Sequence, residues 1–168
     1  MAACVLSDGV SATVLSGAET PNRGRVALVD SETSLLPETT HLASHTADAS
    51  GFRVVLHPLL AETIEIPVKE AIDVLLERNR VKKDAVIGWC LHPGGSRILK
   101  ALQKQLQLTD AQMEFSRKSL RDHGNSGSVS VLNVLGLALQ DLRTPGYIVM
   151  AAVGPGITPE TALLHVNP

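Results

Sequence analysis

The stretch WCLHPGGSRIL, residues 89–99, decides how this chain is interpreted. It joins a continuously apolar run, residues 85–91, to a stretch whose apolar residues recur at helical spacing. Such a run is typical of a strand in a sheet that is covered on both faces. Pro-Gly-Gly alone would make the turn, so His92 indicates either a site where the backbone approaches a ligand or a ring that bonds a nearby carbonyl.

Composition and charge limit the class of protein. With 168 residues, 44% of them hydrophobic, and a net charge of -2, the chain is one packed domain or one lobe of something larger. The absence of a dense basic run, with only one Trp, one Tyr and two Phe, argues against a nucleic-acid partner. No window is long enough for a membrane span, and no signal peptide is visible, so we expect a soluble, cytoplasmic protein. Cys4 and Cys90 give neither a disulfide framework nor a zinc motif, which fits a reducing compartment.

Hydrophobic spacing predicts a layered α/β design. Residues 2–15 favour two strand segments around Ser7-Asp8-Gly9, and a polar loop is expected over 31–50. Thr109 and Gln112 predict a capping box for a helix that ends before Gly124. The remaining expected elements are strands at 25–30, 52–56, 85–91, 146–153 and 161–166, a helix with Pro67 in its first turn, a helix striped by Ile98, Leu99, Leu102 and Leu106, and a helix over 127–142 that is buried all round.

A second polar element lies just before that last helix. Asn125 stands in the stretch HGNSGSVSVL, residues 123–132, where an ordinary helix cap is the alternative to a functional role. Gly154-Pro155-Gly156 forms a third motif, between the two last strands. HPGG, the stretch from Ser116 to Asn125, and VGPGITPET together resemble the C-terminal half of type III polyketide synthases, the chalcone and stilbene synthase group. LSDG (6–9) and GFRVVL (51–56) add to the resemblance, which runs in order from about Ala2 to Asn167.

The resemblance implies a thiolase-like layered fold, with residues 1–168 forming a chalcone/stilbene synthase-like C-terminal domain. It also implies an acyltransferase with a Cys-His-Asn triad that condenses malonyl-CoA with an acyl-CoA starter, without a cofactor or metal. His92 and Asn125 match the family's His and Asn, which act in decarboxylation and as the oxyanion hole. An amide and an imidazole donor that converge on developing negative charge suit that role. An imidazolium can also hold a nearby Cys as thiolate.

The resemblance further places substrate-binding positions and shows departures from the family pattern. The family's two gatekeeping phenylalanines fall at Leu6 and Val54, both aliphatic here, and the first Gly of its GFGPG motif is Ala152. Smaller lining residues favour a long aliphatic starter over an aromatic one. The expected substrate-binding residues are Leu6, Val54, Gly94, Gly95, Gly127 and Pro155.

The family's nucleophilic Cys has no counterpart in this chain, because it lies a few dozen residues before the LSDG strand. The chain starts almost directly inside that strand, so we expect it to be a half that works with a Cys-bearing N-terminal half or with a full-length subunit, as a homo- or hetero-oligomer. Cys90 shares a strand face with His92, two residues away, but a buried Cys is usually a small hydrophobe.

Three hypotheses remain from the sequence. The first is an acyltransferase lobe that depends on an N-terminal half; the second is a truncated, non-catalytic thiolase-fold module that pairs with full-length subunits. The third is an independent Cys-His hydrolase that uses Cys90. His41, His45 and Asp48 have i, i+4, i+7 spacing that could bind a metal on a helix, but the segment is expected to be a solvated loop.

Overall fold

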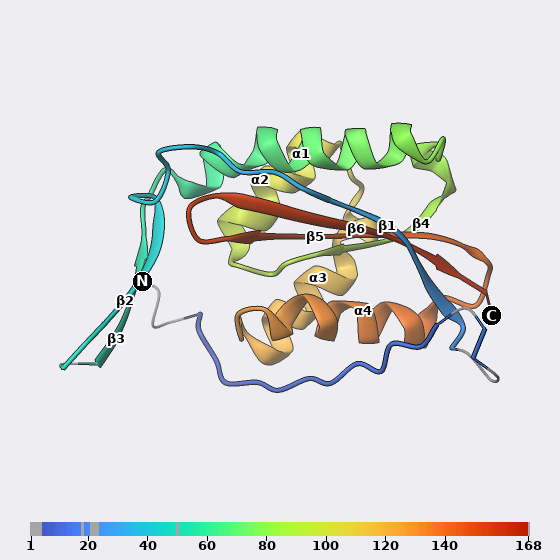
Figure 1. The fold of residues 1–168 in the computed structure, drawn as a ribbon, viewed down its shortest axis with the longest axis horizontal. Coiled ribbons are helices and arrows are strands. Elements are labelled where there is room, and N and C mark those ends of the chain that lie inside the picture. Colours follow the sequence, from blue (N-terminus) through green and yellow to red (C-terminus); the bar gives the residue numbers. More distant parts are fainter. Residues whose placement is uncertain (1–4, 18, 21–23, 50, 168) are drawn as a thin grey trace.

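A four-stranded mixed sheet forms the middle layer of the fold (Figure 1). The computed structural model describes residues 5–17, 19–20, 24–49 and 51–167, without the side chain of Phe52. Antiparallel pairing joins the first three strands in the order β1-β6-β5, and β4 pairs with β5 in parallel. The strands are β1 (Val26–Thr33), β4 (Val86–Leu91), β5 (Gly146–Gly154) and β6 (Thr158–Val166). The four strands predicted in these regions are therefore confirmed.

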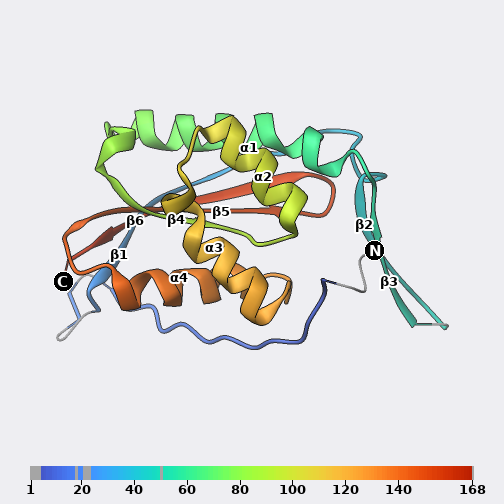
Figure 2. The ribbon, with the colours of Figure 1, turned by 180° about the vertical axis from the view of Figure 1, so that it is seen from behind.

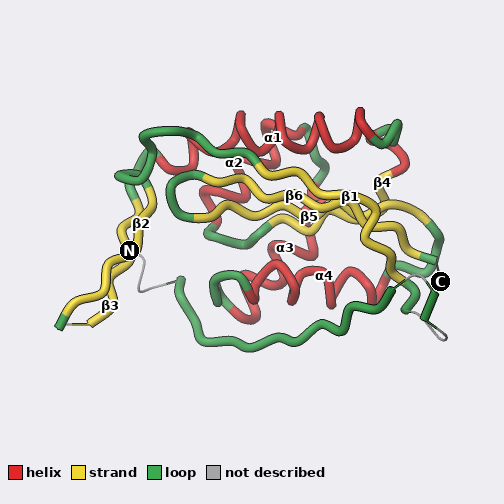
Figure 3. The backbone as a smooth tube through the Cα atoms, viewed as in Figure 1, coloured by secondary structure: helices red, strands yellow, loops and turns green. Residues whose placement is uncertain are grey.

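Helices cover both faces of this sheet (Figures 2 and 3). The helices α1 and α2 lie side by side on one face, and α4 lies on the other. The helix α3 contacts the edge strand β4 and packs against α4. The bounds are α1 (Leu60–Arg78), α2 (Ser96–Leu106), α3 (Asp110–His123) and α4 (Val129–Asp141), and a short 3₁₀ turn, Lys83–Ala85, precedes β4.

The two faces of β4 contribute to different parts of the core. Trp89 and Leu91 belong to the larger apolar cluster, which joins the sheet to α1 and α2. Cys90 points to the opposite face and belongs to a smaller cluster with Val134 and Ala138 of α4. Side chains alternate across a strand, so a continuously apolar run is what a strand between two helix layers requires.

The helix α1 begins earlier than the sequence predicts. Pro67 was expected in the first turn, but the helix starts at Leu60 and Pro67 lies inside it. A proline inside a helix removes one backbone hydrogen bond and costs about 3 kcal/mol. Leu60 and Ile64 continue the buried stripe through the first two turns, and their burial offsets that cost.

The start of α3 is confirmed as a capping box. The Thr109 hydroxyl accepts the backbone N–H of Gln112, and the Gln112 side chain accepts the backbone N–H of Thr109. Gly124 caps the other end of the helix with φ +70°, a conformation that favours glycine. The carbonyl end of α3 is therefore fixed directly beside Asn125.

A separate two-stranded hairpin contradicts the predicted loop over 31–50. Strand β2 (Ala43–Asp48) pairs with β3 (Gly51–Leu56), the strand that the sequence does predict. The hairpin projects from the end of the layered body (Figure 1). Most of β2 is exposed and alanine is its one apolar residue type, so its apolar alternation is too weak to mark a strand in the sequence. Strand β1 also ends later than predicted, since it runs on to Thr33 rather than to residue 30.

The predicted strands over residues 2–15 are wrong for the described part of that segment. Residues 5–17 run as an extended segment beside α4, with a single parallel bridge between Leu6 and Asn125 (Figure 1). A strand needs a neighbour for its backbone groups, and no described strand lies beside this segment as a partner. Residues 2–4 lie outside the described part of the chain.

The helix over 127–142 is shorter and less buried than predicted. In α4 only Ser130, Val134 and Ala138 are fully buried, because only one side of the helix faces the sheet. The other side is half-buried or exposed and lies beside the extended segment 5–17. The prediction that this helix is buried all round is therefore wrong for the described residues.

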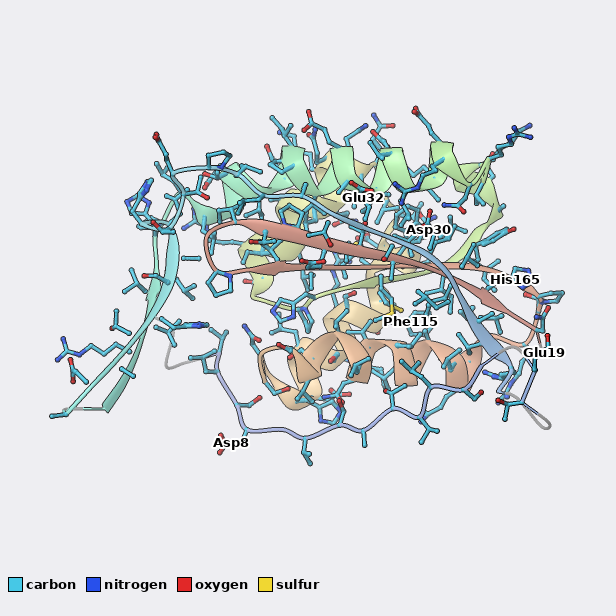
Figure 4. The ribbon with its side chains drawn as sticks, in the orientation of Figure 1. Asp8, Glu19, Asp30, Glu32, Phe115 and His165 are labelled. Atoms are coloured by element: carbon cyan, nitrogen blue, oxygen red, sulfur yellow. The ribbon has the colours of Figure 1, made fainter. Side chains whose placement is uncertain are left out.

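Ion pairs attach the outer strand β1 to the end of α1. Arg78 donates to Asp30 at 2.8 Å and to Glu32 at 2.6 Å, and Asn79 donates to Asp30 as well. Figure 4 shows both carboxylates beside α1. The hydrogen bonds from Arg78 and Asn79 lower the pKa of Asp30 to about 2.

In the described part of the chain, every helix is too short or too polar to span a bilayer.

Candidate active site

His92 is held at the end of β4 by bonds on both sides of the strand. Its own backbone N–H donates to the Ala151 carbonyl of β5 at 2.8 Å. On the outer side, the Leu91 N–H donates to the hydroxyl of Ser116, a fully buried residue of α3, at 3.1 Å. Because β4 is the edge strand, this N–H would otherwise be buried without a partner. The strand end that carries His92 is thus fixed by the sheet and by α3.

The two glycines after His92 have different local roles. A Cβ on Gly94 would lie 3.3 Å from the imidazole Cδ2 of His92, so the missing side chain leaves room for the ring. Gly95 has φ +154° and serves as the N-cap of α2. Nothing lies within 4 Å of a Cβ placed on Gly95, so its requirement is conformational rather than one of space.

Asn125 faces the His92 loop from the turn between α3 and α4. Its side-chain Nδ2 lies 3.4 Å from the Gly94 carbonyl, the outer limit of a hydrogen bond. Its Oδ1 accepts the backbone N–H of Gly127 at 3.0 Å. The amide therefore joins the two loops that the sequence singles out, although they are 31 residues apart.

Both loops open into one pocket of about 710 Å³. His92, Asn125, Gly94, Gly127, Pro155, Leu6 and Val54 line it, so the structure brings together all the predicted site residues except Gly95. The rest of the wall is mostly aliphatic. The sequence did not indicate a role in the site for several of these residues. It placed Ala43 and His45 in a loop and Val68, Ile98 and Leu102 on helix stripes, and it assigned Leu60 and Ile64 to no element.

The sequence pattern at these pocket residues did not distinguish a pocket wall from an ordinary core. Leu60, Ile64 and Val68 lie four residues apart on α1, which is the spacing of any core-facing stripe. Such a stripe does not reveal whether it packs on a sheet or also borders a cavity. His45 pairs with Val54 across the hairpin. Because residues 31–50 were predicted to be a loop, this pairing was not expected.

The His92 imidazole lies in an environment that disfavours its charged form. Its Nδ1 is buried and no described group hydrogen-bonds to it. Burial lowers the pKa of His92 below its usual value near 6.5. At neutral pH the ring is therefore uncharged, and one of its nitrogens carries a proton that it can donate.

Cys90 does not share the pocket with His92. Its side chain is fully buried on the α4 face of the sheet, and burial raises the pKa of the thiol to about 12. A thiol with so high a pKa holds almost no thiolate at neutral pH, and the thiolate is the nucleophile. The sequence placed Cys90 and His92 on the same face of one strand. That rule does not apply, because β4 ends at Leu91 and His92 lies beyond it.

The pKa of His92 predicts a pH dependence of stability. The unfolded chain binds a proton as the pH falls through about 6.5, whereas folded His92 binds one only at lower pH. Below 6.5 the unfolded state holds more protons, so the free energy of unfolding falls as the pH falls. We expect this loss to be smaller in His92→Gln, measured by urea unfolding between pH 7.5 and 5.5. Equal pH slopes for the two proteins, or an NMR titration of His92 at or above 6.5, would contradict the assignment.

The residues with metal-binding spacing, His41, His45 and Asp48, do not lie on a helix. His45 and Asp48 belong to β2, and His41 lies in the turn before it. The His41 ring instead makes an edge contact with the ring of His57, with centroids 6.4 Å apart. In the described residues, no group of three or more His, Cys, Asp or Glu side chains is placed to bind a metal.

Comparison with known proteins identifies the family. The model of the C-terminal domain of chalcone and stilbene synthases matches residues 27–168, so the chain belongs to this family. A 1,3,6,8-tetrahydroxynaphthalene synthase of Streptomyces peucetius subsp. caesius is 32% identical over 98% of this chain and 45% of its own length. The type III polyketide synthase pspB of Penicillium soppii is also 32% identical, over 98% of this chain and 46% of its own length. The chain thus spans about half the length of the curated relatives it matches.

Solved structures confirm the layered fold. The 1,3,6,8-tetrahydroxynaphthalene synthase of Streptomyces coelicolor A3(2), a bacterial type III polyketide synthase, superposes with a TM-score of 0.78 at 28% identity. The match covers 85% of this chain and 41% of that one. The thiolase-like α/β fold that the resemblance implies is therefore confirmed, together with the resemblance itself.

Proposed function

We propose that this chain is the C-terminal half of a type III polyketide synthase and supplies the His and Asn of its active site. The observation that carries the proposal is the pairing of His92 and Asn125 in one pocket, with the Asn125 amide beside the Gly94 carbonyl. The family assignment supports it, since the relatives are polyketide synthases. The substrates would be an acyl-CoA starter and malonyl-CoA.

The proposed reaction is a decarboxylative Claisen condensation. Malonyl-CoA loses its free carboxylate as CO₂, and the electron pair of the broken C–C bond forms the enolate of acetyl-CoA. The enolate carbon attacks an acyl-cysteine thioester, the cysteine leaves as thiolate, and the product is a 3-oxoacyl-CoA. His92 and Asn125 would donate hydrogen bonds to the thioester oxygen as negative charge develops on it. Asn125 is buried and His92 half-buried, and such bonds are stronger where contact with water is reduced.

The nucleophile would come from a Cys-bearing N-terminal half, joined to this chain or carried by another subunit. In the described part of the chain, Cys90 is the one cysteine, and it is buried away from the pocket with a raised pKa. The same observation favours the second candidate, a non-catalytic module that pairs with full-length subunits. It argues against the third, a hydrolase that uses Cys90.

The pocket wall supports an aliphatic starter. Leu6 and Val54 stand where the family's gatekeeping phenylalanines are expected, and the other large apolar side chains of the wall are leucine, isoleucine and valine. Aliphatic walls without aromatic rings suit an alkyl chain, which gains free energy from burial without ring stacking. We propose a fatty acyl-CoA rather than an aromatic one as the starter.

The proposal is tested by acylation of the chain alone and in combination. We expect no covalent adduct when this chain is incubated with labelled acyl-CoA, because Cys90 is inaccessible and protonated. Intact-mass spectrometry measures this, with Cys90→Ala as the matched control. Addition of a compatible Cys-bearing N-terminal half should give an adduct on that half and 3-oxoacyl products from malonyl-CoA. An adduct on Cys90 that turns over would overturn the proposal, and a well-folded pair without product would favour the non-catalytic module.

Exposed apolar residues predict association of the isolated chain. Val10, Val14 and Leu15 of the extended segment are 91%, 94% and 83% exposed. Contiguous apolar surface of this kind is uncommon on monomers and marks contact surfaces. We expect the chain to self-associate or to bind the N-terminal half, and Val10→Ser with Val14→Ser to weaken this. Light scattering after size exclusion at several concentrations measures it. A monomer that persists at high concentration and binds no hydrophobic dye would contradict the expectation.

A further inference from the structure

The extended segment is hydrogen-bonded to the Asn125 turn through a short clamp, which consists of Val5, Leu6 and Ser7. The Asn125 N–H donates to the Val5 carbonyl at 2.7 Å, and the Ser7 N–H donates to the Asn125 carbonyl at 2.9 Å. The Ser7 hydroxyl donates to the His123 carbonyl at 2.5 Å. Asn125 is therefore held by both of its backbone polar groups, and the residue two positions before it is held as well.

The turn is shaped to accept this clamp. Gly124 has φ +70°, and a Cβ there would lie 3.0 Å from the Val5 carbonyl oxygen and 3.2 Å from the Ser7 Cβ. A side chain at this position would force the two segments apart. The clamp carries the segment's hydrogen bonds to the turn, because no hydrogen bond between described residues involves the backbone of residues 8–16. Beyond the clamp, Gly9 only packs against the turn, where a Cβ on it would lie 2.8 Å from the Ser126 Cβ.

The orientation of the Asn125 amide depends on this backbone. On its pocket side the amide has one weak contact, 3.4 Å to the Gly94 carbonyl, and one local bond within the turn, from the Gly127 N–H. Neither fixes where the turn itself lies relative to His92. The Val5 and Ser7 bonds fix the Asn125 backbone from the opposite side. Leu6 and Ser7 both line the pocket, so the clamp also joins the pocket wall to the amide.

We propose that Ser7 is a positioning residue for Asn125. Its N–H and hydroxyl hold the turn so that the Asn125 amide stays directed into the pocket beside His92. This role rests on the proposed function, in which that amide stabilises the thioester oxygen. Ser7 itself acts through the backbone of the turn and transfers no proton or group.

Amide hydrogen exchange tests the clamp without any activity. Ser7→Pro removes the N–H that donates to the Asn125 carbonyl, and Ser11→Pro places the same change in the exposed part of the segment. In the chain bound to its N-terminal half, we expect the Asn125 N–H to exchange about tenfold faster in Ser7→Pro and at the wild-type rate in Ser11→Pro. Equal exchange in all three proteins would overturn the clamp. If Ser7→Pro does not fold, Ser7→Ala against Ser7→Thr tests the other bond of the clamp, from the Ser7 hydroxyl to the His123 carbonyl, because threonine keeps the hydroxyl and alanine removes it. Faster exchange of the Asn125 N–H in Ser7→Ala than in Ser7→Thr is then the expected result, and equal exchange would overturn the clamp.

A double-mutant cycle tests whether Ser7 acts through Asn125. In the assembled synthase we expect Ser7→Pro to lower kcat about tenfold with KM nearly unchanged, and Ser7→Ala to lower it about fivefold with recovery in Ser7→Thr. In an Asn125→Ala background, the Ser7 changes should have no further effect. A loss that persists in that background would show a merely structural role and overturn the inference. If Asn125→Ala itself leaves turnover intact while the exchange result holds, the proposed function fails instead.

Discussion

His92→Ala and Asn125→Ala should each lower the rate of condensation about 100-fold to 1,000-fold in the assembled synthase. Removal of one donor to a developing oxyanion has a cost of this size when the site excludes water. Both residues line the same pocket, and Asn125 is only 8% exposed. The measurement is the rate of 3-oxoacyl-CoA formation from malonyl-CoA, followed by mass spectrometry under saturating substrate.

Two further variants serve as comparisons, one that changes only the chemistry of Asn125 and one that lies away from the pocket. Asn125→Asp keeps the size of the side chain but replaces the amide donor by a carboxylate, which would repel the oxyanion, so it should be at least as damaging as alanine. Ser11→Ala, in the exposed part of the extended segment, should keep the wild-type rate. Near-normal rates in both alanine variants would show that the two residues do not have the proposed roles.

Trp89→Ala should destabilise the fold by about 3–5 kcal/mol, the usual cost of removing a buried tryptophan side chain. Trp89 is 1% exposed, belongs to the main core cluster and lies three residues before His92. A loss of this size is a large fraction of the stability of an ordinary domain. We expect a lower urea midpoint and a looser site, measured by denaturant unfolding of the chain bound to its N-terminal half.

Cys90→Ala is the matched control, because Cys90 is the next residue of the same strand and faces the other helix layer. It removes one small group and should cost about 1 kcal/mol. If the two variants were equally stable, Trp89 would not be the main contact between β4 and the layer of α1 and α2.

Local signals explain which parts of the fold could be predicted from the sequence. A short run of neighbouring residues is enough to predict the strand before His92, the Thr109 capping box and the two last strands. The structure confirms all of them. The pairing of His92 with Asn125 in one pocket came from the family resemblance, because no local pattern connects two loops 31 residues apart.

The wrong secondary-structure predictions share a physical cause: packing and pairing with residues distant in the sequence decided these elements. The strand β2 has alanine as its one apolar residue type and is mostly exposed, so no apolar pattern in the sequence indicated its pairing with β3. Pro67 is tolerated inside α1 because packing on the sheet outweighs one lost hydrogen bond. The segment before β1 has the composition of a strand but lies where the described chain offers no strand partner.

The hairpin of β2 and β3 has a consequence for how such an enzyme can diversify. Val54 and His45 face the pocket from a two-stranded sheet that shares no ladder with the main one, and the Gly156 N–H bonds to the Ala43 carbonyl at its base. Substitutions on such an exposed element change stability little. Single mutations in the hairpin can therefore change the shape of the pocket, while the main sheet and the helices that hold His92 and Asn125 keep their structure. Under the proposed function, such mutations would change which starter or chain length fits the cavity without unfolding the protein.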